Sequence, residues 1–297
     1  MSAIEFQGLW RHFAEKHVLC GLDLAVQPGQ VFALLGRNGA GKTTALRILL
    51  GLLEPHEGAA RILGKDSRSL APEDRDCIGY VAEGHRLYVE MRVRDAVSFE
   101  AATRPRFERA HAERELARCG LDPRKRVWQL SRGQRAQLAL ILAAAGKPDV
   151  LVFDDPAMGL DVAMRRDLLG TLIELLSERG CAVLFSSHIL SDVERIADRV
   201  GVLHGGRLIV DAPLDELKRR VQKRHWVPKN GSTEPELGGH GGVLRARRAD
   251  GGFELTLLDL DGPGEAALRE QAAHLSERHS PDLEELFLDL TSAEAAR

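Results

Sequence analysis

The stretch Gly36-Arg37-Asn38-Gly39-Ala40-Gly41-Lys42-Thr43 decides the fold of this chain, because it has the spacing G-x-x-x-x-G-K-[ST]. It directly follows the apolar run Val31 to Leu35 and leads into the helix-like sequence Thr43 to Leu53. A strand, a glycine-rich loop and a helix in this order form a phosphate-binding loop, whose amide N–H groups and helix N-terminus point at the anion. The pattern predicts that Lys42 reaches the phosphates and that Thr43 offers its hydroxyl to Mg2+. The alternative is a glycine-rich turn before an ordinary helix.

The composition excludes several classes of protein. With 297 residues, 44% of them apolar, the chain is long enough for one large domain and an accessory one. A net charge of -3 lacks the basic character expected of a nucleic-acid binder. The four cysteines form no C-x-x-C pair, so neither a zinc site nor a disulfide framework is indicated, and a reducing cytosol fits. No signal-like N-terminus and no run of about eighteen apolar residues occurs, so we expect that the chain neither enters nor spans a membrane by itself.

After the glycine-rich loop, strand-like and helix-like runs alternate, which predicts an α/β fold with a largely parallel sheet. The sequence Gly84 to Gln129 is charged, helix-prone and without a strand signal, so we interpret about residues 84–147 as a helical insertion. His204-Gly205-Gly206 predicts a hairpin that closes the core near Val210. The expected strands are 4–6, 31–35, 78–81, 150–153, 182–186 and 200–203, and the expected helices are 43–53, 135–145, 162–178 and 191–197.

Two acids follow a second apolar run, because Val150 to Phe153 leads directly into Asp154 and Asp155. In phosphoryl-transfer sites a carboxylate at such a strand end holds Mg2+, and a neighbouring carboxylate polarises the attacking water. We assign the first role to Asp154 and the second to Asp155. Acids are also common at ordinary strand-to-loop junctions, so this interpretation depends on the phosphate-binding loop upstream.

The segment Leu130-Ser131-Arg132-Gly133-Gln134 precedes an amphipathic helix and therefore lies at a helix N-terminus, which is a second anion-binding geometry. Taken alone, Ser131 is better interpreted as a plain helix cap. Together with the phosphate-binding loop and the strand that ends in Asp154, the segment resembles the signature of ABC-type ATPases. The resemblance extends from about Ile4 to the end of the chain by motif order, and it implies ATP and Mg2+ as ligands. It also implies that the signature of one subunit closes over the nucleotide held by another.

The resemblance implies roles for further residues. Phe13 would stack on adenine, although an aromatic residue near an N-terminal strand is as often part of the core. Glu83 occupies the position of a glutamine that contacts Mg2+ or water, and His188 would contact the γ-phosphate, although a lone histidine after a strand is usually structural. Gly159-Leu160-Asp161 looks like the loop that crosses the dimer interface. The implied nucleotide-binding residues are Phe13, Gly36, Arg37, Asn38, Gly39, Ala40, Gly41, Lys42, Thr43, Thr44, Ser131, Gly133, Gln134 and Asp161, with Asp155, His188 and Glu83 in catalysis and Thr43, Glu83 and Asp154 on the metal.

Two residues depart from the pattern of the family. Arg132 replaces a glycine at a position where the family tolerates basic residues. Asp155 stands where the family has a glutamate that orients or deprotonates water, and aspartate is one methylene shorter. Misplacing a catalytic group by about 1 Å can cost about a hundredfold in rate. We therefore expect slow hydrolysis, unless the local backbone compensates.

The sequence beyond Asp211 has a different texture. Pro213 to Arg224 predicts a helix, whose basic residues could touch anionic lipid or nucleic acid or form a solvated face. Asn230 to Gly242 predicts a flexible loop or linker. The end, Asp282 to Leu288, resembles that of ABC exporter ATPases with a small C-terminal α+β domain, and its apolar spacing also fits an ordinary docking helix. Between these segments we expect strands over 243–247 and 253–258 and a helix over 264–278.

The resemblance therefore predicts a P-loop NTPase core of the ABC ATPase type over residues 1–212 and an accessory α+β domain over 213–297. Such a chain would be a peripheral exporter ATPase on the cytoplasmic face of the cell membrane. Two copies, or this chain and a related one, would enclose two MgATP molecules. A separate membrane-spanning subunit would bind near the Glu83 loop and the helical insertion, and no nucleic-acid partner is expected. Two alternatives remain: an ATP-dependent dimerisation switch with little turnover, motivated by Asp155, and a soluble ABC-type ATPase that acts on ribosomes or DNA.

Overall fold

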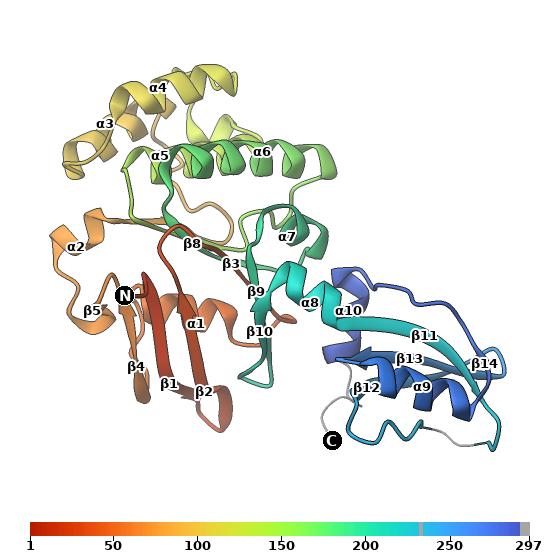
Figure 1. Ribbon diagram of the computed structural model, residues 1–297. Helices are drawn as coiled ribbons and strands as arrows, with labels where there is room; N and C mark the ends of the chain where they lie inside the picture. The colour runs from red at the N-terminus through yellow and green to blue at the C-terminus, as the bar shows by residue number, and fades with distance from the viewer. Residues whose placement is uncertain (232–233, 292–297) are drawn as a thin grey trace. The chain divides into compact units, whose positions relative to one another are not determined.

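The protein is described by a computed structural model that covers residues 1–231 and 234–291. Two compact units follow one another along the chain, the first comprising Met1–Asp211 and the second starting at Ala212 (Figure 1). The loop expected over 230–242 includes residues 232–233, and the tail includes 292–297, which lie outside the described residues. None of the helices in the described ranges is long and apolar enough to cross a bilayer.

A six-stranded sheet forms the centre of the first unit. Its strands are ordered β10 (Arg207–Pro213), β9 (Arg199–His204), β3 (Val31–Leu35), β8 (Ala182–Ser187), β7 (Val150–Asp154) and β6 (Ile78–Val81). The pairs β9–β3, β3–β8, β8–β7 and β7–β6 are parallel. Every residue of β3, β7 and β8 is buried, as expected for a parallel sheet that is covered on both faces. The parallel sheet predicted from the sequence is confirmed, and so is the hairpin at residues 204–206.

The two faces of this sheet pack against different helices. Val152 of β7 belongs to the same core cluster as Leu46 of α1 (Lys42–Leu49). Its neighbour Phe153 points to the opposite face, where it lines an apolar gap with residues of α5 (Arg132–Ala145) and α6 (Val162–Arg179). Figure 1 shows α5 and α6 across the sheet from α1. Outside the insertion, this unit also contains α2 (Pro72–Asp76), α7 (Leu190–Ile196) and the 3-10 turn η1 (Ser67–Ser69), whereas the 3-10 turn η2 (Val127–Gln129) lies within the insertion.

An antiparallel sheet covers α1 and was largely missed by sequence reasoning. It has the order β2 (Lys16–Val26), β1 (Ile4–Phe13), β4 (Glu57–Ile62) and β5 (Lys65–Asp66). Only residues 4–6 were expected to be a strand, and that expectation was too short. The register of β1 against β2 shifts at several points, which breaks the strict alternation of apolar and polar residues on which prediction depends.

The helical insertion lies between β6 and β7 and has a small core of its own. Its helices are α3 (Val93–Thr103) and α4 (Arg109–Arg118), which pack on α5 (Figure 1). Val97, Leu116 and Ile141 belong to that core. The prediction of a helical segment without strand signal is confirmed here. The helix expected over 43–53 was too long, since α1 ends at Leu49, before Gly51 adopts a left-handed φ of 68°.

The second unit is a four-stranded antiparallel sheet with helices, built on a core that includes Trp226, Leu255 and Leu268. Two helices predicted here were too long: Val221–Arg224 begins a strand, and so does Ala272. In both places pairing with a neighbouring strand replaces the helix that the local sequence favours, because cross-strand contacts outweigh helix propensity. The elements are α8 (Leu214–Arg220), β11 (Val221–Pro228), β12 (Gly242–Ala249), β13 (Gly252–Leu258), α9 (Gly262–Gln271), β14 (Ala272–Leu275) and α10 (Leu283–Thr291), with the sheet order β12-β13-β11-β14.

Candidate active site

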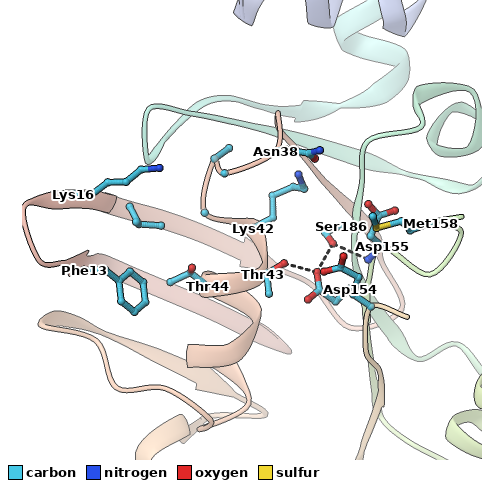
Figure 2. A pocket seen from close by; sticks show the side chains of 15 residues that line it. Phe13, Lys16, Asn38, Lys42, Thr43, Thr44, Asp154, Asp155, Met158 and Ser186 are labelled. Atoms are coloured by element: carbon cyan, nitrogen blue, oxygen red, sulfur yellow. Dashed lines mark hydrogen bonds between the residues drawn. The ribbon is translucent and has the colours of Figure 1, made fainter. Parts of the chain in front are cut away.

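An open cavity of about 520 Å3 lies in the first unit, where β3 and β7 end and the segments that follow them meet. Ligands of open α/β sheets bind at this carboxyl edge of the strands. Figure 2 shows Lys42 in the middle of the cavity wall, Phe13 and Lys16 on one side, and Asp155 and Met158 on the other. The cavity is lined by Phe13, Lys16, Val18, Asn38, Gly39, Ala40, Gly41, Lys42, Thr43, Thr44, Glu83, Asp154, Asp155, Met158 and Ser186.

Close packing explains two of the glycines in the phosphate-binding loop. A Cβ atom on Gly36 would lie 2.8 Å from the carbonyl oxygen of Leu203, and one on Gly41 would lie 2.7 Å from that of Val18. Gly41 also has a left-handed φ of 111° and is the N-cap residue of α1, without a side-chain capping bond. The first amides of α1 therefore carry no side-chain cap and remain available to an anion.

Lys42 is buried in the cavity wall, and its ammonium group is held by its own loop. Its Nζ atom donates to the carbonyl oxygens of Gly36 at 2.6 Å and of Arg37 at 3.4 Å. Burial lowers the pKa of Lys42, and the nearby carboxylates of Asp155 and Asp154 oppose that shift. The cavity thus contains a cation that a polyphosphate would contact, with two carboxylates near it.

A chain of hydrogen bonds joins the ends of the strands around Lys42. Asp154 Oδ1 accepts from the hydroxyl of Thr43 at 2.9 Å and from that of Ser186 at 3.0 Å, and the Ser186 hydroxyl accepts from the backbone N–H of Asp155 at 3.0 Å (Figure 2). Thr43 and Asp154 are 111 positions apart in the chain. A hydroxyl and a carboxylate oxygen in contact at a cavity wall are the kind of ligands that a hard divalent cation prefers.

Asp155 has an unusual backbone and one unsatisfied oxygen. Its φ of 47° is left-handed, a conformation that costs a non-glycine residue of order 1 to 3 kcal/mol. Its Oδ2 atom accepts from Nδ1 of His188 at 2.5 Å, whereas Oδ1 is buried and has no hydrogen-bond partner in the ranges that the structure describes. Burial raises the pKa of Asp155, while His188 and Lys42 oppose that shift. A donor from a bound molecule would satisfy Oδ1.

Phe13 and Glu83 also line the cavity. Phe13 is 46% exposed, so the core interpretation considered for it does not fit. The guanidinium carbon of Arg11 lies 4.7 Å from the centre of the Phe13 ring. Glu83 follows β6, and its side chain joins the cavity wall near Lys42.

The signature segment and Asp161 are not among the residues that line this cavity. The hydroxyl of Ser131 accepts from the N–H of Gln134 at 3.1 Å, and Oε1 of Gln134 accepts from the N–H of Ser131 at 3.1 Å, which is a capping box at the start of α5. Asp161 Oδ1 accepts from the N–H of Met164 at 2.9 Å and so caps α6. Within one chain these residues therefore stabilise helix termini, and their contact with nucleotide stays a prediction.

Sequence reasoning missed four residues of the cavity wall, namely Lys16, Val18, Met158 and Ser186. Ser186 could have been found, because it stands two positions before His188 at the end of a predicted strand. Lys16 and Val18 belong to β2, which was not expected, and only the pairing of β2 with β1 brings them to the cavity.

The fold and this cavity define a P-loop nucleotide-binding protein with an inserted helical segment. The sequence profile of the ABC transporter family matches residues 19–158. The ABC transporter ATP-binding protein YhaQ of Bacillus subtilis is 31% identical over 95% of this chain and 96% of its own length. Nod factor export ATP-binding protein I of Paraburkholderia xenovorans is 32% identical over 99% of this chain and 98% of its own length. The chain therefore belongs to the family of ABC transporter ATP-binding proteins.

A solved structure gives the same result. The ATP-binding subunit of an ABC transporter superposes with a TM-score of 0.66 at 28% identity, and the match covers 73% of this chain and 92% of that one. The resemblance to ABC-type ATPases inferred from the motifs is confirmed. The chain is an ATP-binding and ATP-hydrolysing subunit of an ABC transporter.

Proposed function

We propose that this chain powers an exporter by binding MgATP in the cavity around Lys42. The hydrogen-bond chain Thr43–Asp154–Ser186–Asp155–His188 is the observation that carries the proposal, since it joins two hydroxyls, two carboxylates and an imidazole, and both carboxylates lie near the buried ammonium group of Lys42. The relative from Paraburkholderia xenovorans is named as an export ATP-binding protein, and this supports the direction of transport.

The binding half of the mechanism follows from charge and geometry. The amides at the start of α1 and the ammonium of Lys42 hold the β- and γ-phosphates, and Lys42 exchanges its carbonyl partners for phosphate oxygens. Oxygens of Thr43 and Asp154, with Glu83 at the same wall, would hold Mg2+, which neutralises part of the phosphate charge when bound. Phe13 stacks on the adenine ring from the other side of the cavity.

In the hydrolytic half, Asp155 orients the attacking water and accepts its proton. The unsatisfied Oδ1 atom is the acceptor for that water, and the bond from Oδ2 to His188 keeps the carboxylate oriented. His188 is half-exposed, so its free ring edge can reach the γ-phosphate. The left-handed backbone at Asp155 sets the position of its carboxylate, whose side chain is one methylene shorter than the glutamate usual at this position.

A second copy, or a related chain, would complete each site. Because Ser131 and Gly133 do not line the cavity of their own chain, the capped N-terminus of α5 would meet the nucleotide of a partner. Met158 and Val162 flank the Gly159–Asp161 loop and are exposed apolar residues, which such an interface would bury. Two nucleotides would then be enclosed head to tail.

The helical insertion carries an exposed aromatic cluster that fits a membrane-embedded partner. Tyr88 and Trp128 are 66% and 55% exposed, and Phe99 is also exposed. The rings of Tyr88 and Phe99 are 5.6 Å apart, and the N–H of Trp128 donates to the carbonyl of Val89. Tyr88 follows Glu83 closely in the chain, so a partner bound here lies next to the nucleotide site. We assign the chain to the cytoplasmic face of the membrane, peripherally bound through this cluster.

Affinity capture of the tagged chain from detergent-solubilised membranes, with and without MgATP, tests this proposal. We expect recovery of a polytopic membrane protein with the wild-type chain and loss of that protein with a Tyr88→Ser, Trp128→Ser double variant that still binds ATP. Recovery of soluble partners alone would contradict the transporter assignment of this surface and favour a soluble ABC-type ATPase.

Substitutions of Asp155 distinguish this proposal from the alternative of an ATP-dependent dimerisation switch with little turnover. We expect Asp155→Asn to lower ATP turnover by about a hundredfold, because the carboxylate that accepts the proton is lost. Asp155→Glu should retain measurable turnover. A wild-type rate equal to that of Asp155→Asn, with ATP-dependent dimerisation preserved, would instead support a switch with little hydrolysis. Steady-state phosphate release and light scattering measure the two properties.

A further inference from the structure

His85 connects two loops of the cavity by a single hydrogen bond. It lies two residues after Glu83 and is only 7% exposed. Its Nε2 atom is 2.7 Å from the carbonyl oxygen of Pro156. Because a carbonyl oxygen can only accept, Nε2 carries the proton and His85 is the donor. The loop after β6 is therefore joined to the residue that directly follows Asp155.

The Pro156 carbonyl is the point at which the Asp155 loop is held from outside. The carbonyl of Asp155 accepts from the N–H of Met158 at 3.1 Å, and that of Ala157 accepts from the N–H of Leu160 at 3.2 Å. These two bonds lie inside the loop, whereas the carbonyl between them is bonded by His85. At the other end, the N–H of Asp155 donates to Ser186.

On both sides of this hydrogen bond a residue has a strained backbone. Asp155 has a φ of 47° and His85 a φ of 52°, both left-handed conformations that a non-glycine residue keeps only when its surroundings hold it. A cavity of about 330 Å3 adjoins the contact and is lined by Glu83, Gly84, His85, Arg132, Arg135, Met158 and Gly159. Of the loop after Asp155, Met158 and Gly159 face this cavity, so on this side the loop is joined to the Glu83 segment by the hydrogen bond from His85.

We propose that His85 is a positioning residue for ATP hydrolysis, because its bond to Pro156 fixes the backbone that presents the Asp155 carboxylate to the attacking water. The bond also makes the position of Asp155 depend on the position of the Glu83 loop. The inference rests on the proposed role of Asp155 in the same cavity. His85 itself does not line the cavity around Lys42.

The test compares three variants of His85 in the full chain. His85→Phe keeps a ring of similar size without a donor. His85→Gln places an amide N–H where Nε2 lies, and His85→Asn carries the same amide one methylene short of Pro156, in a residue that tolerates left-handed φ. His111→Leu is the matched control, since His111 is also buried, at 6% exposure, but lies in α4 of the helical insertion. The kcat and KM for ATP and the melting temperature are measured for each.

We expect His85→Phe and His85→Asn to lower kcat by about ten- to a hundredfold, with KM for ATP changed by less than about threefold, because Asp155 is displaced while the phosphate-binding loop is untouched. His85→Gln should restore kcat to within about threefold of wild type, since it retains the donor. His111→Leu should change the melting temperature without a change in kcat per folded molecule. If His85→Phe does not fold, the Gln and Asn pair alone decides, because it differs only in reach.

A double variant separates this inference from the role of Asp155. If His85 acts through Asp155, His85→Phe adds no further loss of kcat in an Asp155→Asn background. An equal loss in both backgrounds, an unchanged kcat in folded His85→Phe, or a defect in His85→Gln as large as in His85→Asn would each overturn the proposal. If Asp155→Asn itself keeps the wild-type rate, the proposed role of Asp155 fails and this inference with it. If Asp155→Asn is inactive while His85→Phe has the wild-type kcat, the inference about His85 alone fails.

Discussion

At the scale of single residues, the cavity combines side chains whose chemistry differs but whose positions depend on one another. Asp154 is held by two hydroxyls, and the shared hydroxyl of Ser186 also receives the N–H of Asp155. A change in any of these residues therefore moves a neighbour as well. Lys42 donates to the backbone carbonyls of Gly36 and Arg37 in its own loop, so phosphate oxygens can replace these partners without breaking a side-chain pair.

Phe13 is the residue whose role can be tested with least disturbance of the fold. Base stacking on an aromatic ring is worth about 1 to 3 kcal/mol. We expect Phe13→Ala to weaken ATP binding by about five- to 150-fold, in line with that energy, and to leave the melting temperature unchanged because the ring is half-exposed. Isothermal titration calorimetry measures the affinity. Phe13→Tyr, which keeps the ring, is the control, and equal affinities of Phe13→Ala and wild type would exclude stacking.

At the scale of elements, the start of α5 lies close against α6 because Gly133 has no side chain. A Cβ atom on Gly133 would lie 2.7 Å from Sδ, 2.8 Å from Cγ and 3.1 Å from Cβ of Met164. Rotation of the Met164 side chain can relieve the first two contacts but not the third. The glycine of the signature segment therefore has a packing role in a single chain, independent of any nucleotide.

This packing predicts that a substitution of Met164 partly compensates for a substitution of Gly133. We expect Gly133→Ala to lower the free energy of unfolding by about 1 to 3 kcal/mol, because it overpacks the contact between α5 and α6. Met164→Ala should restore part of that loss in the double variant, although it costs stability by itself. Urea denaturation measures all three variants. A double variant whose loss is the sum of the two single losses would show that Gly133 and Met164 do not compete for the same space.

A buried charge cluster plays a comparable part in the second unit, where it joins α10 to the sheet. Asp289 accepts from Arg245 at 2.8 Å and from the hydroxyl of Thr256 at 2.5 Å, and it lies 3.4 Å from Nζ of Lys223. Lys223 and Thr256 are buried, on neighbouring strands β11 and β13. Removal of the carboxylate would leave the buried ammonium of Lys223 with too little opposite charge.

We expect Asp289→Ala to destabilise the second unit by about 3 to 5 kcal/mol, because it breaks a buried ion pair by removing one partner. Glu285→Ala is the matched control: its carboxylate is 3.5 Å from the same Lys223 but more exposed, so its loss should cost at most about 1 kcal/mol. Denaturant unfolding followed by the fluorescence of Trp226, a core residue of this unit, reports the effect. Equal costs for the two variants would contradict the importance of burial.

At the scale of the whole molecule, the two units have separate cores, and all residues of the cavity wall belong to the first. We expect a fragment of residues 1–211 to fold and to bind ATP with the affinity of the full chain, because domains with their own core can fold alone. Circular dichroism and calorimetric titration check both parts of this expectation. An unfolded fragment would show that the first unit needs the second in order to fold, whereas a folded fragment that does not bind ATP would show that the second unit contributes to the site.

The candidate site could be predicted from the sequence where its residues belong to contiguous motifs. The motifs predicted residues 36–44 and Asp154, and of these Asn38 to Thr44 and Asp154 line the cavity, because a strand, a loop and the next element follow one another within a few residues and such local order is visible along the chain. Lys16 and Val18 were missed because they reach the cavity from β2, which depends on a partner strand with an irregular register. His85 carried no motif, since its hydrogen bond joins positions 71 apart.

By itself, the sequence determined the phosphate-binding loop, the family, and the order along the chain of the motifs that lie at the strands of the parallel sheet. These features depend on short patterns of residue type. The tertiary structure alone decided which strands pair at long range, including β1 with β4 and β11 with β14, and which side chains meet at Asp155. The physical reason is that the free energy of a pairing between distant segments lies in contacts that neither segment contains alone. Local propensity therefore predicted helices at Val221 and Ala272, where strand pairing prevailed.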